Sequence, residues 1–375
     1  MGITRIANIT GLDHIGIPVV MVCRPNARSL SVSQGKGVHL PAARASGVME
    51  SIEAYHAESI TSPLRYCTFE ELRYENAVVD IPRLPKLRGS LFHPNLKILW
   101  IEGRDLLTDQ AVWVPHELVH TDFTLPLPSG SGCFPLTSNG LASGNHILEA
   151  TCHAICELVE RDATALWNIL GTEEKRKTRL DLESIDDPQC LQLLEAFEKA
   201  KVAVGVWETT SDIGIPAFLC TIIDRETDRI QPLYATSGMG CHPSRQIALI
   251  RALTEAAQSR LTFIAGSRDD TGRAGYRSSM SLDTINRFQE EVVLQQKSYR
   301  DFRGIKPWLG DTFNDDLDMM LRNLASAGME QVIVVNLTKR VFNIPVVRVV
   351  IPGLEGSSQA KGYCPGERAQ QRLNT

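Results

Sequence analysis

Residues 138–145 read Ser-Asn-Gly-Leu-Ala-Ser-Gly-Asn and open a segment with helical character. Residues 33–37, Ser-Gln-Gly-Lys-Gly, open a second segment of the same kind. Glycine lets the backbone turn sharply and leaves N–H groups able to face an anion at the start of a helix. Two glutamates follow each turn, 13 and 16 residues after its last glycine: Glu157 and Glu160 in one segment, Glu50 and Glu53 in the other. We interpret the two segments as copies of one glycine turn followed by an acidic helix.

The spacing of these glutamates predicts a shared acidic pocket. Glutamates three residues apart lie on one face of a helix. Asn145 and Glu149 stand in the first turns of the later segment, where Glu149 lies about 80° around the helix from Glu157. If the helix faces meet, five carboxylates converge: those of Glu50, Glu53, Glu149, Glu157 and Glu160. Such carboxylates repel one another unless they bind protons or cations, and beside a glycine turn they suit Mg²⁺ bound to a polyphosphate.

A weaker third copy begins at residues 237–240, Ser-Gly-Met-Gly. The helical run 247–263 that follows carries Arg251 and Glu255, and Glu255 takes the place that Glu157 holds in its own copy. The alternative for any one glutamate is a solvated helix surface, where most charged side chains lie. Recurrence of the same offset favours the shared pocket.

The order of the segments predicts a mixed α/β (α+β) fold. β-Branched runs entered through proline recur at residues 15–20, 213–218 and 343–347, and proline is tolerated at the first residue of a strand. Strand, glycine turn and acidic helix therefore repeat, which is typical of a domain assembled from related units. We expect a single domain over residues 1–375, with its core at about 11–356.

The composition, with 43% hydrophobic and 22% charged residues, is that of a soluble globular protein. A net charge of −5 without a basic stripe gives no reason to expect nucleic acid as a partner. Nine cysteines without a CxxC pair indicate reduced thiols in a cytosolic protein. The apolar run 17–23 is too short to cross a membrane. We expect a cytoplasmic protein without a membrane partner, and an exposed polar loop over 265–280.

Two patterns typical of metal sites fit a structural role better. Residues 116–120, His-Glu-Leu-Val-His, match the HExxH pattern of zinc proteases, which needs a continuous helix. Pro115 ends a predicted strand just before them, and Pro126 closes any helix within about two turns. Cys152, His153 and Cys156 could share a metal, because cysteines four residues apart can hold one, but small thiols inside a helix are usually core residues. The sequence has neither a P-loop nor a dinucleotide-binding fingerprint.

Residues 34–53, 143–162 and 251–260 together resemble the YcaO superfamily, and the resemblance extends over about 11–356. It implies a YcaO-type fold and an ATP site without a P-loop, in which glutamates bind Mg²⁺ ions that bridge the phosphates. The metal ligands that it implies are Glu50, Glu53, Glu149 and Glu157.

The resemblance also implies a set of nucleotide contacts, which comprises Ser33, Lys36, Ser46, Asn145, Glu160, Arg161, Arg251 and Glu255. Of these, Glu160, Arg161 and Arg251 are implied to be catalytic. An arginine and Mg²⁺ would neutralise the charge of the moving phosphoryl group, which is where most phosphoryl-transfer catalysis comes from.

Members of this superfamily use ATP to activate a backbone amide of a peptide. Attack by an internal Cys, Ser or Thr side chain gives an azoline, and attack by an external sulfide gives a thioamide. Many azoline-forming members end in a PxPxP tail, which residues 357–375 lack. The opening Gly-Leu-Asp-His-Ile-Gly-Ile-Pro at 11–18 is similar to members that work with a TfuA-like partner.

We therefore expect an enzyme that forms a thioamide in a peptide or protein substrate, with ATP, Mg²⁺, a sulfur donor and a TfuA-like protein. An azoline-forming cyclodehydratase is the alternative within the family. A non-catalytic nucleotide-binding scaffold is a third hypothesis, and a homodimer is implied by the resemblance alone.

Overall fold

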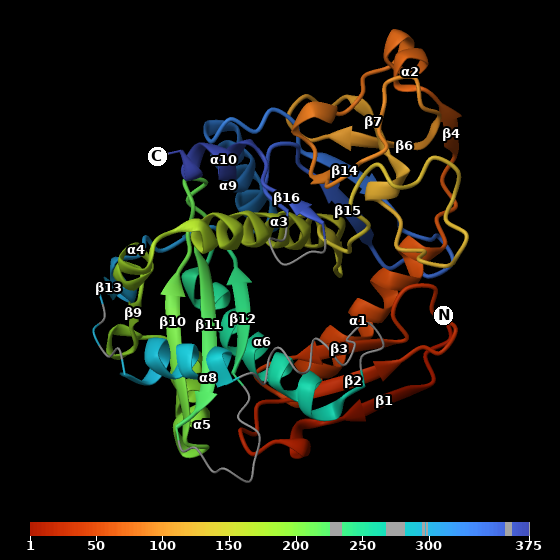
Figure 1. Cartoon of the computed structure of the whole chain (residues 1–375). Helices are drawn as coiled ribbons and strands as arrows, with labels where there is room; N and C mark the ends of the chain where they lie inside the picture. Colours follow the sequence, from red (N-terminus) through yellow and green to blue (C-terminus); the bar gives the residue numbers. More distant parts are fainter. Residues whose placement is uncertain (226–234, 268–281, 295–296, 298, 357–361, 375) are drawn as a thin grey trace.

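The computed structural model describes residues 1–225, 235–267, 282–294, 297, 299–356 and 362–374. Of the loop predicted over 265–280, residues 268–280 lie outside this part. Helices and several sheets are combined in the chain, so the predicted mixed α/β class is confirmed (Figure 1).

The helices are α1 (Leu40–Glu58), α2 (Phe69–Glu75), α3 (Ile147–Ile169), α4 (Thr172–Lys177), α5 (Pro188–Lys199), α6 (Arg245–Ala265), α8 (Leu282–Gln289), α9 (Phe313–Ser326) and α10 (Glu367–Leu373). Short helical turns occur at Thr10–Leu12, Ile81–Arg83, His116–Leu118, Leu182–Ser184, Glu290–Leu294 and Phe302–Gly304. No helix in the described part of the chain is both long and apolar enough to span a bilayer.

Two three-stranded antiparallel sheets each pair with one helix. The first consists of β1 (Arg5–Asn8), β2 (Val19–Cys23) and β3 (Val32–Lys36), against which α1 packs. The second consists of β10 (Val202–Glu208), β11 (Ala217–Asp224) and β12 (Thr236–Cys241), against which α6 packs.

The largest sheet has the order β4-β6-β14-β15-β8, with β7 paired to β6, and all its pairs are antiparallel. Its strands are β4 (Leu64–Cys67), β6 (Ile98–Asp105), β7 (Ala111–Pro115), β8 (Leu141–Ser143), β14 (Ile333–Asn336) and β15 (Val346–Val350). Two small pairs complete the structure, the antiparallel β5 (Lys86–Leu87) with β16 (Tyr363–Cys364) and the parallel β9 (Leu180–Asp181) with β13 (Arg300–Asp301). Helix α3 crosses the middle of the molecule, between the β10-β11-β12 sheet and the strands β14 and β15 (Figure 1).

Three strands lead into helices in the same way. Each helix begins four residues after its strand ends: β3 at Lys36 and α1 at Leu40, β8 at Ser143 and α3 at Ile147, β12 at Cys241 and α6 at Arg245. A side chain supplies each helix cap, because His39, His146 and Ser244 accept hydrogen bonds from backbone N–H groups of the first turn.

Small residues let each strand lie directly on its helix. A Cβ atom added to Gly35 would stand 2.1 Å from the backbone oxygen of Ala43, and one added to Gly240 would stand 2.1 Å from that of Ala248. These glycines are therefore required by close backbone approach. Ala142 holds the corresponding position on β8, and it belongs to the same buried core cluster as Ala150 of α3.

The predicted proline entries are confirmed. β2, β11 and β15 begin directly after Pro18, Pro216 and Pro345. Proline has no N–H to donate, so it is suited to the residue just outside a strand.

Candidate functional site

The three strand–helix units β3–α1, β8–α3 and β12–α6 contact one another through polar side chains. The backbone N–H and the hydroxyl of Ser143, at the end of β8, donate to Glu53 of α1 at 2.9 and 2.6 Å. Lys36 Nζ, at the end of β3, lies 2.5 Å from Glu255 Oε2 of α6. Each contact joins the strand end of one unit to the helix of another, so α1, α3 and α6 face a common centre.

Glu53 lies at the acidic side of this centre. Burial raises the pKa of Glu53 to about 8 in spite of the hydrogen bonds from Ser143, and the charges of Glu50 and Glu157 add to the increase. The structure therefore brings three of the predicted carboxylates within electrostatic range of each other. The charged form of Glu53 is disfavoured at neutral pH unless a cation compensates it.

Arg161 lies between the acidic residues of α3 and α6. Its guanidinium is 3.6 Å from Glu157 Oε1 and 3.5 Å from Glu160 Oε1. Burial would lower the pKa of Arg161, but the charges of Glu160, Glu157 and Glu255 outweigh it and raise that pKa. Burial raises the pKa of Glu160 to about 7, with Arg161 opposing the increase.

Glu255 is held ionised by two cations. Burial would raise its pKa, yet the charges of Lys36 and Arg161 keep that pKa below its ordinary value. The backbone N–H of Met239 also donates to Glu255, at 3.3 Å. Lys36 and Glu255 therefore form an ion pair that spans the first and third units.

Basic side chains lie beside the glutamates of the centre. Arg251 donates to the backbone oxygen of Cys241 at 3.1 Å. Burial of His242 lowers the pKa of that histidine to about 3, and the nearby charge of Arg251 adds to the decrease. His153 of α3 lies in electrostatic range of Arg251, Lys36 and His242. Cations beside carboxylates are the charge pattern that a metal–polyphosphate complex requires.

Ser46, Asn145, Glu149 and Ser33 make more local contacts. The Ser46 hydroxyl accepts from the Lys36 backbone N–H at 3.4 Å. Glu149 accepts from the backbone and side-chain N–H groups of Asn145, at 2.8 and 3.1 Å, within the first turn of α3. Ser33 is buried in β3 opposite Val22. Glu149 thus stands apart from the other glutamates of the site. The charges of those others act on one another; they are Glu50, Glu53, Glu157, Glu160 and Glu255.

The donor atoms fit Mg²⁺, which prefers carboxylate oxygens. Glu53 and Glu160 have raised pKa values, and a bound cation would lower both of them. Among the residues that the structure describes, no three His, Cys, Asp or Glu side chains stand close enough to hold a metal as they are. For the predicted ligands Glu50, Glu53, Glu149 and Glu157 to hold an ion together, their side chains would have to turn from the positions that they hold in this structure.

The HExxH stretch has a structural role. Its helical turn covers only His116–Leu118, which is too short to place both imidazoles on one metal. The Glu117 carboxylate accepts from the backbone N–H groups of Gly132, Cys133 and Phe134 at 2.6, 3.0 and 3.0 Å. Glu117 therefore fixes a loop, a role that the sequence did not predict.

Sequence reasoning missed several residues of the centre, namely Ser143, His153, His242 and Arg348. His153 holds the same place in its unit as Ser46 and Arg251 hold in theirs, so an alignment of the three units would have found it. Arg348 lies in the fully buried strand β15, and its charge acts on Glu157. Ser143 stands in the glycine turn at 138–145, but nothing in the sequence marks its contact with Glu53, and no motif marks Arg348, because these contacts depend on tertiary packing.

Comparison with known proteins adds the family. A family model described as YcaO cyclodehydratase, ATP- and Mg²⁺-binding, matches residues 34–355. The chain belongs to the YcaO family. The description of the family agrees with the predicted cofactors, ATP and Mg²⁺.

Two relatives of this YcaO protein match over nearly all of its length. A Rhizobium leguminosarum bv. trifolii protein, named as an uncharacterized protein in the tfuA 3′ region, is 38% identical over 94% of this chain and 84% of its own. A Methanothermobacter thermautotrophicus protein is 35% identical over 95% of this chain and 90% of its own.

Solved structures share the fold. A heterocyclase in complex with substrate and cofactor has a TM-score of 0.78 at 22% identity, over 94% of this chain and 50% of its own. YcaO from Methanopyrus kandleri, bound with AMPPCP and Mg²⁺, has a TM-score of 0.72 at 21% identity, over 97% of this chain and 91% of its own. At such identities the likeness concerns the fold, and it identifies the architecture described above as that of YcaO proteins.

Proposed function

We propose that this YcaO protein uses ATP and Mg²⁺ to convert a backbone amide of a peptide or protein into a thioamide, together with a sulfur donor and a TfuA-like partner. The observation that carries the proposal is the centre itself, where burial raises the pKa values of Glu53 and Glu160, and where Glu160 lies against Arg161 and in electrostatic range of Lys36. The position of the Rhizobium relative in a tfuA 3′ region supports the thioamide product and the partner.

The proposed reaction conserves every atom. Sulfide forms a C–S bond with the amide carbon, and the amide oxygen takes the γ-phosphoryl group of ATP, which releases ADP. The C–O bond then breaks, phosphate leaves with the former amide oxygen, and loss of a proton from sulfur or nitrogen gives the thioamide. An amide oxygen is a poor leaving group, and phosphorylation removes that obstacle.

The residues of the centre have separate roles in this proposal. Glu50, Glu53, Glu149 and Glu157 would hold Mg²⁺, which supplies charge neutralisation at the phosphates when bound. Arg161 would neutralise a phosphoryl oxygen, and its position beside Glu157, one of the residues that would hold Mg²⁺, supports this role. Lys36, Arg251, Ser46, Ser33 and Asn145 would bind phosphate groups, with Glu255 orienting Lys36 through their ion pair.

A cyclodehydratase is the second candidate, because the family description carries that word. It would use the same centre, and the nucleophile would be a Cys, Ser or Thr side chain of the peptide. The two reactions differ in what the product loses and gains, so a mass measurement distinguishes them. A homodimer and a single domain stay predictions.

The test combines the purified protein with ATP, Mg²⁺, sulfide, a TfuA-like protein and candidate substrate peptides. We expect exchange of one oxygen for one sulfur, seen by mass spectrometry, with one phosphate released per product. Loss of water without sulfur would establish the cyclodehydratase instead. ATP binding without phosphate release in any combination would favour the non-catalytic scaffold.

Variants of the acidic helix test the site in the same assay. Glu157→Gln should weaken binding of Mg²⁺ with a non-hydrolysable ATP analogue by about tenfold or more, since groups that hold a metal carry that much affinity. Arg161→Ala should lower turnover more than nucleotide affinity. Glu195→Gln, on the exposed face of α5 where Glu195 pairs with Lys199, is the matched control. Unchanged nucleotide binding in Glu157→Gln, measured by calorimetry, would remove Glu157 from the site.

A further inference from the structure

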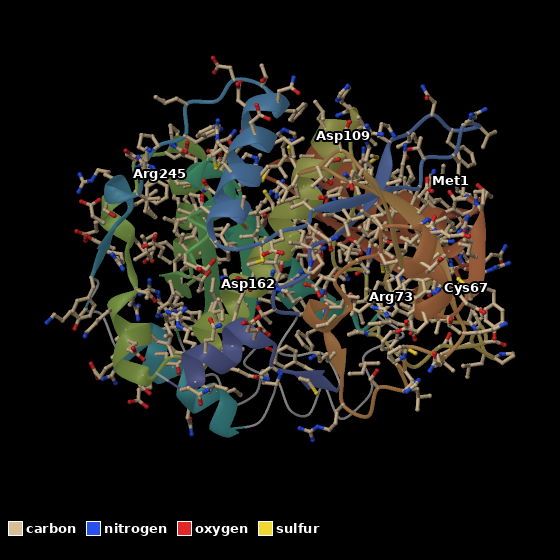
Figure 2. The ribbon with its side chains drawn as sticks, turned by 90° about the horizontal axis from the view of Figure 1, so that it is seen from above. Met1, Cys67, Arg73, Asp109, Asp162 and Arg245 are labelled. Carbon is tan, nitrogen blue, oxygen red and sulfur yellow. The ribbon has the colours of Figure 1, made fainter. Side chains whose placement is uncertain are left out.

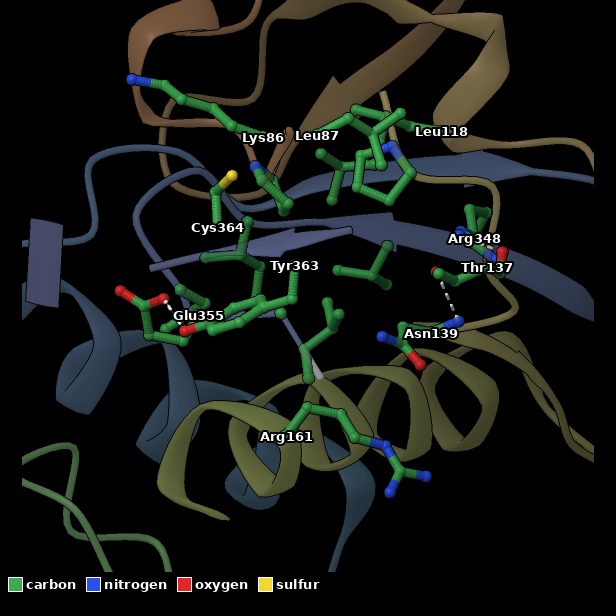
Figure 3. A pocket seen from close by; sticks show the side chains of 18 residues that line it. Lys86, Leu87, Leu118, Thr137, Asn139, Arg161, Arg348, Glu355, Tyr363 and Cys364 are labelled. Atoms are coloured by element: carbon green, nitrogen blue, oxygen red, sulfur yellow. Dashed lines mark hydrogen bonds between the residues drawn. The ribbon is translucent and has the colours of Figure 1, made fainter. Parts of the chain in front are cut away.

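A cavity of about 80 Å³ lies next to the centre, between α3, β15 and the β5–β16 pair (Figure 3). Most of its walls are apolar, and they include Leu87, Leu118, Leu158, Val350, Ile351 and Leu354. Concave apolar sites with a few polar groups at one end are the usual form of small-ligand sites. The size suits one aliphatic side chain or a few water molecules.

Polar side chains lie at both ends of the cavity, Glu355 and Tyr363 at one end and Thr137, Asn139 and Arg348 at the other (Figure 3). Asn139 lies between Thr137 and Arg161 (Figure 3). The backbone N–H of Asn139 donates to the Thr137 hydroxyl at 3.4 Å, whereas its side-chain amide makes no hydrogen bond within the described part of the chain. A primary amide offers both donors and an acceptor, which is the set that pairs with a peptide backbone amide.

Arg348 gives this end of the cavity a positive charge that lacks full compensation. Its side chain is 3% exposed and donates through Nη2 to the backbone oxygen of Thr137 at 2.8 Å. Its Nε and Nη1 atoms are buried without hydrogen-bond partners. A buried donor without a partner is unfavourable, so its presence here calls for a role. A fixed positive charge beside a bound carbonyl stabilises negative charge as it develops on that oxygen.

Arg161 joins the cavity to the centre. The stem of Arg161 lines the cavity, while its guanidinium points away from Glu355 and Tyr363 (Figure 3) and lies against Glu157 and Glu160. Only the Arg161 side chain would therefore separate a group held in the cavity from the phosphoryl group that Arg161 is proposed to neutralise.

We propose that this cavity binds the residue of the substrate peptide that flanks the modified amide. An aliphatic side chain fills the space beside Leu158, Asn139 pairs with the backbone amide, and the Arg348 charge faces the carbonyl oxygen. The inference rests on the proposed function and adds the substrate class, a peptide with an aliphatic residue at this position. Adenine is the competing occupant of an apolar cavity near a nucleotide site.

The experiment uses two probes, N-acetyl-leucine N′-methylamide and N-acetyl-glycine N′-methylamide, with the full chain, Mg²⁺ and a non-hydrolysable ATP analogue. Saturation-transfer NMR titrations should show the leucine probe binding about tenfold more tightly than the glycine probe, the ratio expected for burying an aliphatic side chain. Equal affinities, no binding of the leucine probe, or binding of the leucine probe only when the ATP analogue is left out would overturn the proposal.

Variants locate the bound probe. Leu158→Trp should abolish the preference for leucine by filling the cavity, and Leu158→Ala should shift the preference toward the larger N-acetyl-phenylalanine N′-methylamide. Leu191→Trp, on the exposed side of α5, is the control and should keep the preference for leucine. Asn139→Ala should weaken both the leucine and the glycine probe.

Persistence of the leucine preference in a folded Leu158→Trp protein would overturn the proposal. If the probes show no preference for leucine but the protein still forms a thioamide, the cavity proposal fails and the proposed function stands. Probe binding without any phosphate release would count against the proposed function and not against the cavity.

Discussion

His116 and His120 stack in the protein interior with their ring centroids 4.6 Å apart. Burial lowers the pKa of His116 to about 4, and the charge of His120 adds to the decrease. Burial also lowers the pKa of His120. Both imidazoles are therefore kept neutral, and Glu117, whose carboxylate fixes the neighbouring loop, stands between them in the sequence.

The pair should make the protein sensitive to acid. Since the pKa of His116 falls from 6.5 when unfolded to about 4 when folded, the unfolded chain binds the proton first. Its contribution to stability is present above pH 6.5 and is lost as the pH falls toward 4, by at most about 3 kcal/mol. Urea unfolding at a series of pH values should show this loss in the wild type and a flatter curve in His116→Phe. His93→Phe, at an exposed position, should keep the wild-type slope; equal slopes in all three proteins would contradict the assignment.

At the scale of elements, the charged centre depends on strands that lie almost against the helix backbone. Gly240 of β12 meets Ala248 and Ala252 of α6, and Gly35 of β3 meets Ala43 and Gly47 of α1. Because Lys36 follows Gly35 directly, this close approach sets where its ammonium group can reach. The helix faces that carry the glutamates are thus oriented by the smallest residues in the chain.

A single methyl group should disturb this arrangement. Gly240→Ala places a Cβ atom 2.1 Å from the oxygen of Ala248 and 2.6 Å from the nitrogen of Ala252, so backbone must shift. We expect a loss of about 3 kcal/mol in the free energy of unfolding, at the upper end for overpacking. Gly11→Ala, where no atom lies within 4 Å, is the control and should change little. Equal denaturation midpoints for both variants would show that α6 can move away without cost.

At the scale of the whole molecule, the C-terminal helix α10 is tied to α3. Arg368 donates through Nε and Nη2 to the two oxygens of Asp162 at 2.9 and 3.0 Å. Asp162 has an exposure of 0% and lies well inside the outline of the molecule (Figure 2). Glu355 completes the connection, because its backbone N–H donates to Asp162 and its carboxylate accepts from the Tyr363 hydroxyl and the Ala369 N–H. Asp162 directly follows Arg161, so the end of the chain steadies the centre.

Removal of one partner of this ion pair should be costly. Arg368→Met leaves the Asp162 carboxylate buried without its counter-ion, and such losses cost about 3–5 kcal/mol. Calorimetry should show a lower melting temperature for Arg368→Met, and the double variant with Asp162→Asn should regain part of it because no charge is left to bury. A double variant as unstable as the sum of its single variants would contradict this account of the pairing.

The sequence alone determined the features that depend on local spacing. Glycine turns, proline strand entries and glutamates three residues apart are consequences of backbone geometry within one segment, and they predicted the strands, the helices and their acidic faces. The family resemblance added the identities of the predicted ATP and magnesium residues, whose individual roles stay predictions.

Tertiary structure alone decided which of those faces meet. The contact from Ser143 to Glu53 joins residues 90 positions apart, and that from Lys36 to Glu255 joins residues 219 positions apart. Arg348 is visible only as one residue of a buried strand until β15 brings it beside Glu157. Contacts of this kind arise because packing the strands and helices together buries apolar surface, and no pattern within a single segment specifies which distant charges that packing will bring together.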